Sequence, residues 1–339
     1  MKTNNDPRPF SADALRIDPA AVVEKVESSI REQVLGRLHR RGAVLGLSGG
    51  IDSSVVAALS ARALGKERVF GLFMPERDSS GDSLRLGRLL AESIGIQAEV
   101  EEIGGTLEAV GCYRRQDEAI RTVFAEYGAG YKSKITLPPM LESDRLNVMH
   151  LTVQDPSGKQ MTSRMPPAAF RKLVAATNFK QRVRKMVEYY HADRLGYAVA
   201  GTPNRLEYDQ GFFVKQGDGS ADFKPIAHLY KTQVYALAEF LGIPEEIRSR
   251  PPTTDTYSLE QTQEEFFFAL PYDKMDLCLF AKNHDVPAAE VAPVLGITAE
   301  QVSRVYKDID AKRKAARYLH EGPLLIEPLA SLEAAGGGA

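Results

Sequence analysis

The sequence predicts a three-layer α/β fold, in which helices cover both faces of a doubly wound parallel sheet. Apolar runs of strand length alternate with helical patterns through residues 43–103, and such an order pairs the strands in parallel through right-handed crossovers. With 339 residues, of which 43% are hydrophobic, the chain can bury a substantial core. Ligands of such sheets bind at the carboxyl ends of the strands, so the loops that follow the strands are candidate sites.

An amphipathic helix is predicted over residues 20–40. It follows Asp18-Pro19, a pair that signals a helix start. Residues 1–19 are expected to form an N-terminal tail. The inward face of the helix consists of Val22, Val23, Val26, Ile30, Val34, Leu35 and Leu38.

A short buried strand over residues 43–47, a glycine-rich turn and a helix over residues 52–64 follow in direct succession. In the turn, Gly49 and Gly50 let the backbone change direction without a side chain in the way. The turn therefore aims free backbone N–H groups and the positive end of a helix dipole at one point, which makes an anion site. No Lys follows the glycines, so this is not the GxxxxGK[ST] loop that binds a transferring γ-phosphate.

Polar side chains of the same segment can bind phosphates directly or through a metal ion. Ser48, Ser53 and Ser54 supply hydroxyl donors, and Asp52 supplies a carboxylate that can hold a metal ion. The segment Ser48-Gly49-Gly50-Ile51-Asp52-Ser53-Ser54 therefore predicts the place where a nucleotide's pyrophosphate binds.

The rest of the sheet is predicted from strands over residues 68–74 and 98–103 with a helix over 83–94 between them. A helix over 169–195 and a strand over 197–201 continue the sheet. Downstream, helices are predicted in five places, the fourth of them broken beyond residue 292 by Pro293. These ranges are 229–241, 258–270, 274–282, 288–295 and 298–317. The tail over residues 326–339 is expected to be disordered.

Residues 128–167 form a long irregular insert with a strand-turn-strand pattern over 148–161 around Asp155-Pro156-Ser157-Gly158. A segment of this length inside a compact domain is usually a lid, an interface arm or a disordered insert. Its basic residues could let the segment close over an acid or bind the anionic group of that acid. A solvated arm or a dimer contact is at least an equal alternative. They are Lys132, Lys134, Arg145, Lys159 and Arg164.

Composition excludes several classes of protein. A net charge of −2 gives no electrostatic footprint for nucleic acid, so no nucleic-acid partner is expected. The two cysteines, Cys112 and Cys278, are far apart and form no CxxC, which argues against a disulfide scaffold, a zinc site and a thiol-relay sulfurtransferase. No stretch reaches the roughly 20 apolar residues that a membrane span requires, and the N-terminal residues lack the apolar h-region of a signal peptide. We therefore expect a soluble cytoplasmic protein.

Polar motifs follow in a fixed order through the second half of the chain. A helical run from Asn178 to Met186 precedes Gly201-Thr202-Pro203-Asn204-Arg205-Leu206-Glu207 at a strand end. Lys215-Gln216-Gly217-Asp218-Gly219-Ser220-Ala221-Asp222 and Leu229-Tyr230-Lys231-Thr232-Gln233 come next. Pro252-Thr253-Thr254-Asp255 ends the series.

The SGGxDSS loop resembles the pyrophosphate loop of the ATP pyrophosphatases, and the whole series of motifs resembles NAD synthetase. The resemblance covers about residues 20–315 except the insert and is most specific in GTxNxxE, KxGDGxxD and PTxD. It implies an adenine nucleotide alpha-hydrolase-like (Rossmann-like) fold and a single domain over residues 20–325. It also implies a cytoplasmic homodimer, with the apolar stripes of the helices at 20–40 and 169–193 as plausible contacts.

The resemblance also implies a reaction and a role for each matching residue. A carboxylate, that of deamido-NAD, attacks the α-phosphorus of ATP, and ammonia then displaces AMP from the acyl-adenylate. Asp52 and Glu207 would ligate Mg²⁺, and Lys231 would stabilise the departing pyrophosphate. Asp218 or Asp222 would take a proton from the incoming ammonium. The ATP contacts would be Gly46, Leu47, Ser48, Gly49, Gly50, Ile51, Asp52, Ser53, Thr202, Lys231 and Thr253, and the substrate contacts Arg182, Lys215, Asp222 and Lys312.

The sequence departs from the family pattern at the acceptor end. Ala311-Lys312 stands where the family has His-Lys, and Pro203 and Arg205 alter a GTDHxxE motif that also loses its His. No glutaminase domain is present, so the expected nitrogen source is free ammonia or ammonia from a separate glutaminase.

These departures leave alternatives open beside synthesis of NAD. The same chemistry could act on another acid, such as nicotinate mononucleotide or a biosynthetic carboxylate. The chain could also be a nucleotide-binding protein without turnover, although Asp52, Glu207 and Lys231 are intact. A tRNA-modifying enzyme has no support from the cysteines or from the charge.

Overall fold

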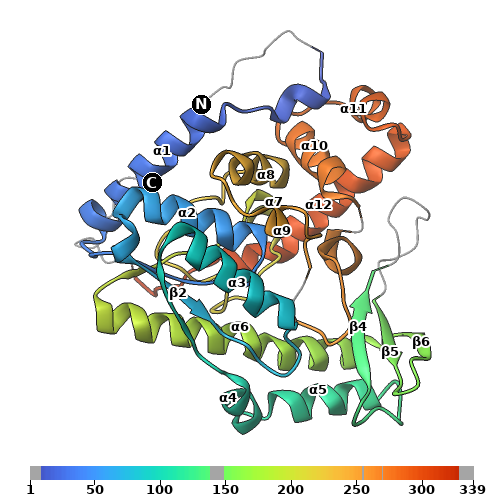
Figure 1. The fold of residues 1–339 in the computed structure, drawn as a ribbon. Helices are drawn as coiled ribbons and strands as arrows, with labels where there is room; N and C mark the ends of the chain where they lie inside the picture. The colour runs from blue at the N-terminus through green and yellow to red at the C-terminus, as the bar shows by residue number, and fades with distance from the viewer. Residues whose placement is uncertain (1–8, 138–148, 254–255, 269, 328–339) are drawn as a thin grey trace.

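A four-stranded parallel sheet lies at the centre of the fold (Figure 1). The computed structural model describes residues 9–137, 149–253, 256–268 and 270–327. All strand pairings in this sheet are parallel, and β1 is the strand at which the chain reverses its direction across the sheet. Ligands of doubly wound sheets bind beside such a switch point. The order is β3-β2-β1-β7, with β1 Ala43–Gly46, β2 Val69–Phe73, β3 Gln97–Val100 and β7 Ala198–Val199.

Helices cover both faces of the sheet, which confirms the predicted fold class. Ala43 and Leu45 of β1 pack with one set of helices, whereas Val44 packs with the other, because successive strand residues point to opposite faces. The first set comprises α1 (Pro19–Arg31), α2 (Ile51–Leu64), α3 (Gly81–Ile94) and α8 (Lys231–Phe240). The second set comprises α4 (Gly104–Ala109), α5 (Cys112–Arg121) and α6 (Pro167–Leu195).

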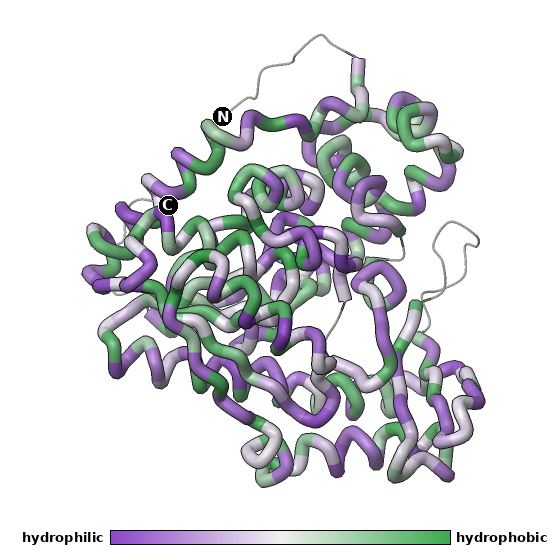
Figure 2. Tube along the Cα trace, viewed as in Figure 1, coloured by the Kyte–Doolittle hydropathy of each residue, from purple (hydrophilic) through white to green (hydrophobic). Residues whose placement is uncertain are grey.

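The N-terminal helix forms as the sequence predicts but ends earlier. Asp18 caps α1 by accepting a hydrogen bond from the backbone N–H of Ala20 at 3.0 Å. Hydrophilic and hydrophobic residues alternate along α1, as expected of a helix with one buried face (Figure 2). A π-helical turn continues it over Glu32–Arg37. The helix closes there because the N–H groups of Leu38 and Arg40 turn back to the carbonyls of Gln33 and Val34.

The described part of the predicted insert contains a small antiparallel sheet, where the sequence predicted an irregular segment with one strand-turn-strand. Its strands are β4 (Lys132–Thr136), β5 (His150–Gln154) and β6 (Gln160–Arg164), in the order β4-β5-β6. The predicted turn over residues 155–158 joins β5 to β6, and Asp155 stabilises it by accepting hydrogen bonds from the N–H groups of Ser157 and Lys159. Arg145 and Val148 lie outside the described residues.

The predicted helix over residues 258–270 is wrong for residues 258–262, since among its described residues only 263–268 are helical, with a π-helical turn over Glu264–Phe268. The preceding backbone instead follows the edge of β4. The N–H of Leu259 donates to the carbonyl of Ser133 at 3.1 Å, and the N–H of Ser133 donates to Ser258 Oγ at 2.9 Å. Bonds to a neighbouring strand replace those that a helix would make.

The C-terminal helices pack together as a second core. Pro293 does not end α11, because Val291 and Leu295 are buried in this core and hold the last turn. Leu15, from a short helix over Ala12–Leu15 in the expected N-terminal tail, is buried in the same core. No helix among the described residues has the length and hydropathy needed to cross a membrane. The helices are α10 (Tyr272–Asn283), α11 (Ala288–Leu295) and α12 (Ala299–His320). Leu206 of α7 (Arg205–Gln210) is buried in this core, whereas Ile247 of α9 (Glu245–Arg248) is buried in the core beside α1, α2, α3 and α8.

Candidate active site

A cavity of about 560 Å³ opens at the carboxyl ends of β1, β2 and β7. Its walls come from the loop after β1, the segment after β2, one face of α6, the loops on both sides of α7, and residues 250–267. This position beside β1 and β7 is the switch point of the sheet, where the sequence predicted a ligand. The volume is in the range of small-molecule sites.

The glycine-rich loop lines the cavity with most of its predicted residues: Gly46, Leu47, Ser48, Gly50, Ile51, Asp52 and Ser53. Gly49 does not line it but shapes the loop. Its φ is +72°, and a Cβ there would lie 2.7 Å from the carbonyl oxygen of Ser83. Only glycine fits that backbone without strain.

The N-terminus of α2 faces the cavity without a side-chain cap. The N-cap residue is Gly50, which has no side chain that could bond to the N–H groups of the first turn. The hydroxyls of Ser53 and Ser54 donate back to the carbonyl of Gly50, at 3.0 and 2.9 Å. These bonds fix the turn, and the N–H groups at the start of the helix are the donors that an anionic ligand can use.

Asp52 and Glu207 lie together on the cavity wall with Lys231. The ammonium of Lys231 pairs with Asp52 Oδ2. Glu207 Oε1 accepts a hydrogen bond from the side-chain amide of Gln263 at 3.0 Å. The three side chains come from the start of α2, from α7 and from the first residue of α8. The sequence predicted this set of residues, and the structure brings them together.

The electrostatics of this group follow from burial and from charge. Burial raises the pKa of Glu207 to about 8, and the nearby charge of Asp52 adds to the effect. Burial alone would lower the pKa of Lys231, but the attraction of Asp52 and Glu207 outweighs it and the pKa is raised. Lys231 is therefore charged, and the two carboxyl groups repel each other unless a further cation or a proton is present.

The donor set fits a hard cation. Asp52 and Glu207 offer carboxylate oxygens to the same cavity, and each oxygen keeps a lone pair beside its present hydrogen bond. Mg²⁺ prefers such oxygens and takes few of them from protein when phosphates supply the others. A cation here would offset both the burial and the repulsion by Asp52, which together raise the pKa of Glu207.

Asp218, Thr202 and Thr253 also line the cavity, as predicted. Asp218 accepts a hydrogen bond from the N–H of Val214 at 2.7 Å. Burial raises its pKa despite this bond. Thr254 and Asp255 of the same PTxD motif as Thr253 lie outside the described residues.

The four predicted substrate contacts do not line the cavity. Arg182 Nε donates to the carbonyl of Lys215 at 3.3 Å, and Lys215 Nζ donates to the carbonyl of Tyr318 at 2.8 Å. Asp222 accepts a hydrogen bond from the N–H of Val199 at 2.7 Å. Lys312 pairs with Asp308 at 2.7 Å and donates to the carbonyl of Phe267 at 2.6 Å, and burial lowers its pKa. Arg182 thus contacts Lys215 outside the cavity, and Asp222 is held by Val199 and by the hydroxyl of Tyr189.

Sequence reasoning missed one face of α6 that lines the cavity. Gln181, Arg184, Lys185 and Glu188 lie on this face, and Lys185 Nζ pairs with Glu188 Oε2 at 2.6 Å. Their spacing of three and four residues is the signal that could have found them, since such positions share one side of a helix. Arg182, although it lies three residues before Lys185, does not line the cavity.

A buried lysine joins two further walls of the cavity. Lys180 Nζ lies 2.6 Å from Asp78 Oδ2, 3.0 Å from Glu76 Oε1 and 2.7 Å from the carbonyl oxygen of Thr256. It therefore connects the segment after β2 to the segment before Tyr257. Burial alone would raise the pKa of Asp78, but Lys180 and Arg77 lower it.

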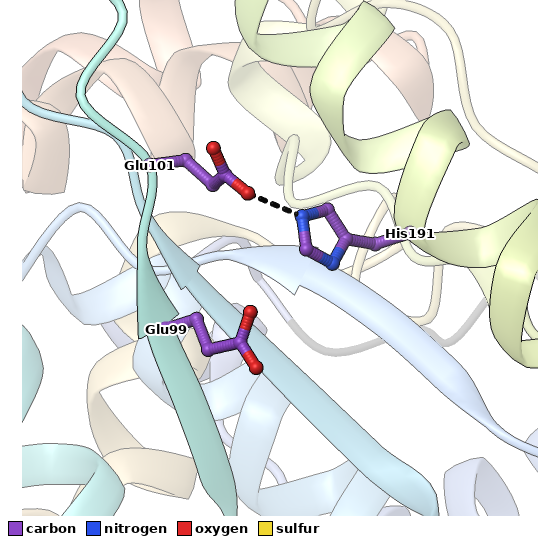
Figure 3. Close-up of side chains that lie close together, drawn as sticks. All are labelled: Glu99, Glu101 and His191. Atoms are coloured by element: carbon purple, nitrogen blue, oxygen red, sulfur yellow. Dashed lines mark hydrogen bonds and ion pairs between the residues drawn. The ribbon is translucent and has the colours of Figure 1, made fainter.

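Glu99, Glu101 and His191 form a second cluster of possible metal ligands, outside the cavity (Figure 3). His191 Nε2 lies 2.8 Å from Glu101 Oε1. Arg194 donates to His191 Nδ1 at 3.0 Å and pairs with Glu99 at 3.5 Å. The guanidinium of Arg194 thus already supplies the positive charge that a metal ion would bring to these carboxylates. Because Nδ1 accepts from Arg194, His191 carries its proton on Nε2, which points at Glu101. We interpret this cluster as a closed hydrogen-bond network.

Comparison with known proteins gives concordant results. The model of the family described as NAD synthase matches residues 22–127 and 142–316. The NH(3)-dependent NAD(+) synthetase of Mesorhizobium japonicum is 66% identical over 311 residues, which cover 92% of this chain and 98% of the relative.

Two solved structures are similar in fold. The NMN synthetase of Francisella tularensis has a TM-score of 0.61 at 20% identity, over 91% of this chain and 98% of that one. The NH3-dependent NAD synthetase of Campylobacter jejuni has a TM-score of 0.60 at 23% identity, over 92% of this chain and 100% of that one.

Proposed function

The chain belongs to the NAD synthase family, and we infer that it is an ATP-dependent carbon–nitrogen ligase that converts deamido-NAD and ammonia to NAD. The relative that is 66% identical over almost the full length of both chains is an NH(3)-dependent NAD(+) synthetase. The likeness to the NMN synthetase, at 20% identity, concerns the fold. Action on another acid and binding without turnover are therefore not favoured.

One observation carries the site assignment within this function. Asp52, Glu207 and Lys231 come from three distant parts of the chain and line one cavity with the glycine-rich loop. We propose that the loop N–H groups, Thr202 and Thr253 bind ATP, and that Asp52 and Glu207 hold Mg²⁺. When bound, Mg²⁺ would neutralise charge that builds on the departing pyrophosphate.

The side chains of this protein have separate tasks in the proposed reaction. The nicotinate carboxylate oxygen attacks the α-phosphorus, the bond to pyrophosphate breaks, and the ammonium of Lys231 stabilises the charge that develops. Ammonia then attacks the acyl carbon and AMP leaves with the bond electrons. Asp218 takes the proton that the attacking nitrogen loses, and its raised pKa makes it a better base than an ordinary Asp.

We propose that Arg182, Lys215, Asp222 and Lys312 contact the dinucleotide. Arg182 and Lys215 lie outside the cavity, where a dinucleotide longer than the cavity would extend. We propose one synthetase domain over residues 20–325, free ammonia or ammonia from a separate glutaminase as nitrogen source, and a homodimer. A cytoplasmic location is consistent with two buried cysteines that carry free thiols.

The function is tested by pyrophosphate release with deamido-NAD, ammonium and glutamine varied separately. We expect AMP and pyrophosphate only when ATP, deamido-NAD and ammonium are all present. ADP as product would exclude the mechanism. Faster turnover with nicotinate mononucleotide than with deamido-NAD would show that deamido-NAD is not the preferred substrate.

The K231M variant tests the role of Lys231. Loss of the ammonium should lower kcat by about 100-fold, since it acts where charge develops. The control is K282M, because Lys282 also pairs with a carboxylate, Asp310 at 2.9 Å, but does not line the cavity. An equal effect of both variants on kcat would contradict the assignment.

A further inference from the structure

Asn204 contacts both carboxylates of the proposed cation site. It is the N-cap residue of α7 and is only 1% exposed. Its side-chain Nδ2 donates to Asp52 Oδ1 at 3.0 Å, and its backbone N–H donates to Glu207 Oε2 at 3.1 Å. One residue thus holds an oxygen of each carboxylate.

The orientation of the Asn204 amide is set by the helix that it caps. Oδ1 accepts hydrogen bonds from the N–H groups of Leu206 and Glu207, at 2.9 and 3.2 Å. An amide oxygen at this position leaves the NH₂ group pointing away from the helix, toward Asp52. The side chain therefore connects the start of α7, which follows β7, to the start of α2, which follows β1.

The remaining carboxylate oxygens are held by other groups. Lys231 pairs with Asp52 Oδ2, and Gln263 donates to Glu207 Oε1. With both oxygens of each group engaged, the two carboxylate planes are fixed before a ligand arrives. Asn204 does this as a neutral donor, and it adds no third negative charge to a pair that already repels.

We propose that Asn204 is a positioning residue that sets the spacing and orientation of Asp52 and Glu207 for Mg²⁺. This rests on the proposed function, since Mg²⁺ belongs to the ATP-dependent reaction. Mg²⁺ demands near-octahedral oxygen geometry, so its binding depends on where the ligands are held. Partners that orient metal ligands typically change metal affinity by about 10- to 100-fold when removed.

The decisive variants are N204S and N204T. Ser and Thr are good N-cap residues and keep the start of α7, but neither side chain carries an amide that reaches Asp52. The measurement is binding of Mn²⁺, an oxygen-seeking probe of Mg²⁺ sites, followed by electron paramagnetic resonance with α,β-methylene-ATP present. This ATP analogue cannot be cleaved between the α- and β-phosphorus, so no turnover enters the result.

We expect both variants to raise the dissociation constant of Mn²⁺ by about 10- to 100-fold. The matched control is T298A, because Thr298 caps α12 with a similar capping box outside the cavity. T298A should lower thermal stability without changing Mn²⁺ binding. Wild-type affinity in N204S or N204T would overturn the proposal, as would equal weakening in T298A.

This test separates the inference from the function on which it rests. If wild-type protein forms no NAD while N204S binds Mn²⁺ weakly, the function fails and the positioning role stands. If wild-type protein forms NAD while N204S binds Mn²⁺ normally, only the positioning role fails.

Discussion

Buried carboxyl groups govern the charge of the site at the residue scale. Glu207 lies beside Asp52 and Lys231, and Asp276 lies behind Lys231 at the start of α8. Asp276 is fully buried and accepts hydrogen bonds from the N–H groups of Lys231 and Thr232, at 3.1 and 2.7 Å. Asp276 thus fixes the backbone from which Lys231 reaches Asp52.

Asp276 should make stability fall as pH rises. Burial raises its pKa from 3.8 to about 7, against the opposing effect of the Thr232 and Lys231 N–H groups. Between these values the folded state holds a proton that the unfolded state has lost, so rising pH favours unfolding. Relative to D276N, which cannot titrate, the wild type should lose roughly 3 kcal/mol of unfolding free energy between about pH 5 and about pH 8. Urea denaturation at both pH values measures this, and a constant difference between the two proteins would contradict it.

Residues that depend on local spacing could be predicted from the sequence. The loop from Gly46 to Ser53 could be assigned because its glycines, hydroxyls and carboxylate follow one another in a strand-to-helix turn. Cys112, which forms no CxxC, is a buried free thiol, and burial raises its pKa to about 11. Lys180 could not be assigned, because its partners Asp78 and Thr256 are brought near it only by the tertiary fold.

At the scale of elements, α6 combines a structural and a chemical face. Lys180 anchors the segments on either side of the cavity, and Arg184, Lys185 and Glu188 line the cavity one and two turns further on. Tyr113 of α5 adds to the anchor by donating to Glu76 Oε2 at 2.9 Å. The helix thus holds the cavity walls that it also lines.

Loss of the Lys180 charge should destabilise the fold strongly. K180M would remove the cation that pairs with both Glu76 and Asp78 and would leave Asp78 with Arg77 alone, which should lower the free energy of unfolding by about 3 to 5 kcal/mol. The control is K134M, because the pair of Lys134 with Glu265 is partly exposed and should contribute less than about 1 kcal/mol. Urea denaturation compares the two, and similar losses would show that the buried cluster does not need its lysine.

Elements that depend on a distant partner escaped prediction. The β4 strand pairs with β5, but its inward positions include Ser133 as well as Ile135, so its apolar alternation is too weak to indicate a strand. Residues 258–261 carry a helical pattern, yet they bond to the edge of β4. Long, strongly patterned elements such as α2, α3 and α6 were predicted within a few residues, because their own sequence determines them.

At the scale of the whole molecule, an exposed stripe on α6 is a candidate contact of the proposed homodimer. Met186 is 59% and Tyr190 63% exposed, and both follow Arg182 at a spacing of four residues. Residues at this spacing share one side of a helix. A proposed dinucleotide contact thus lies in line with two exposed apolar side chains, which supports a dimer that forms next to the acceptor site.

The dimer is tested by mass in solution. Light scattering should give twice the chain mass of 37.3 kDa, and Y190E should shift the protein toward the monomer because it would bury a charge at the contact. F240E is the control, since Phe240 is 49% exposed on α8, away from this stripe. If the wild-type protein is a monomer in solution, the proposed dimer is wrong. The proposed acceptor site then loses the support that it takes from the dimer.

The ion pair between Lys231 and Asp52 joins residues 179 positions apart, and this has a consequence for how the protein survives in the cell. A folding intermediate in which either half of the chain is unfolded cannot form the proposed nucleotide site. Nucleotide therefore binds the completed fold alone and shifts the equilibrium of the whole chain, by about 2.7 kcal/mol when its concentration is 100 times its dissociation constant. Bound ATP would thus stabilise the whole folded chain as well as enter the reaction, and proteolysis in vitro should be slower with nucleotide present.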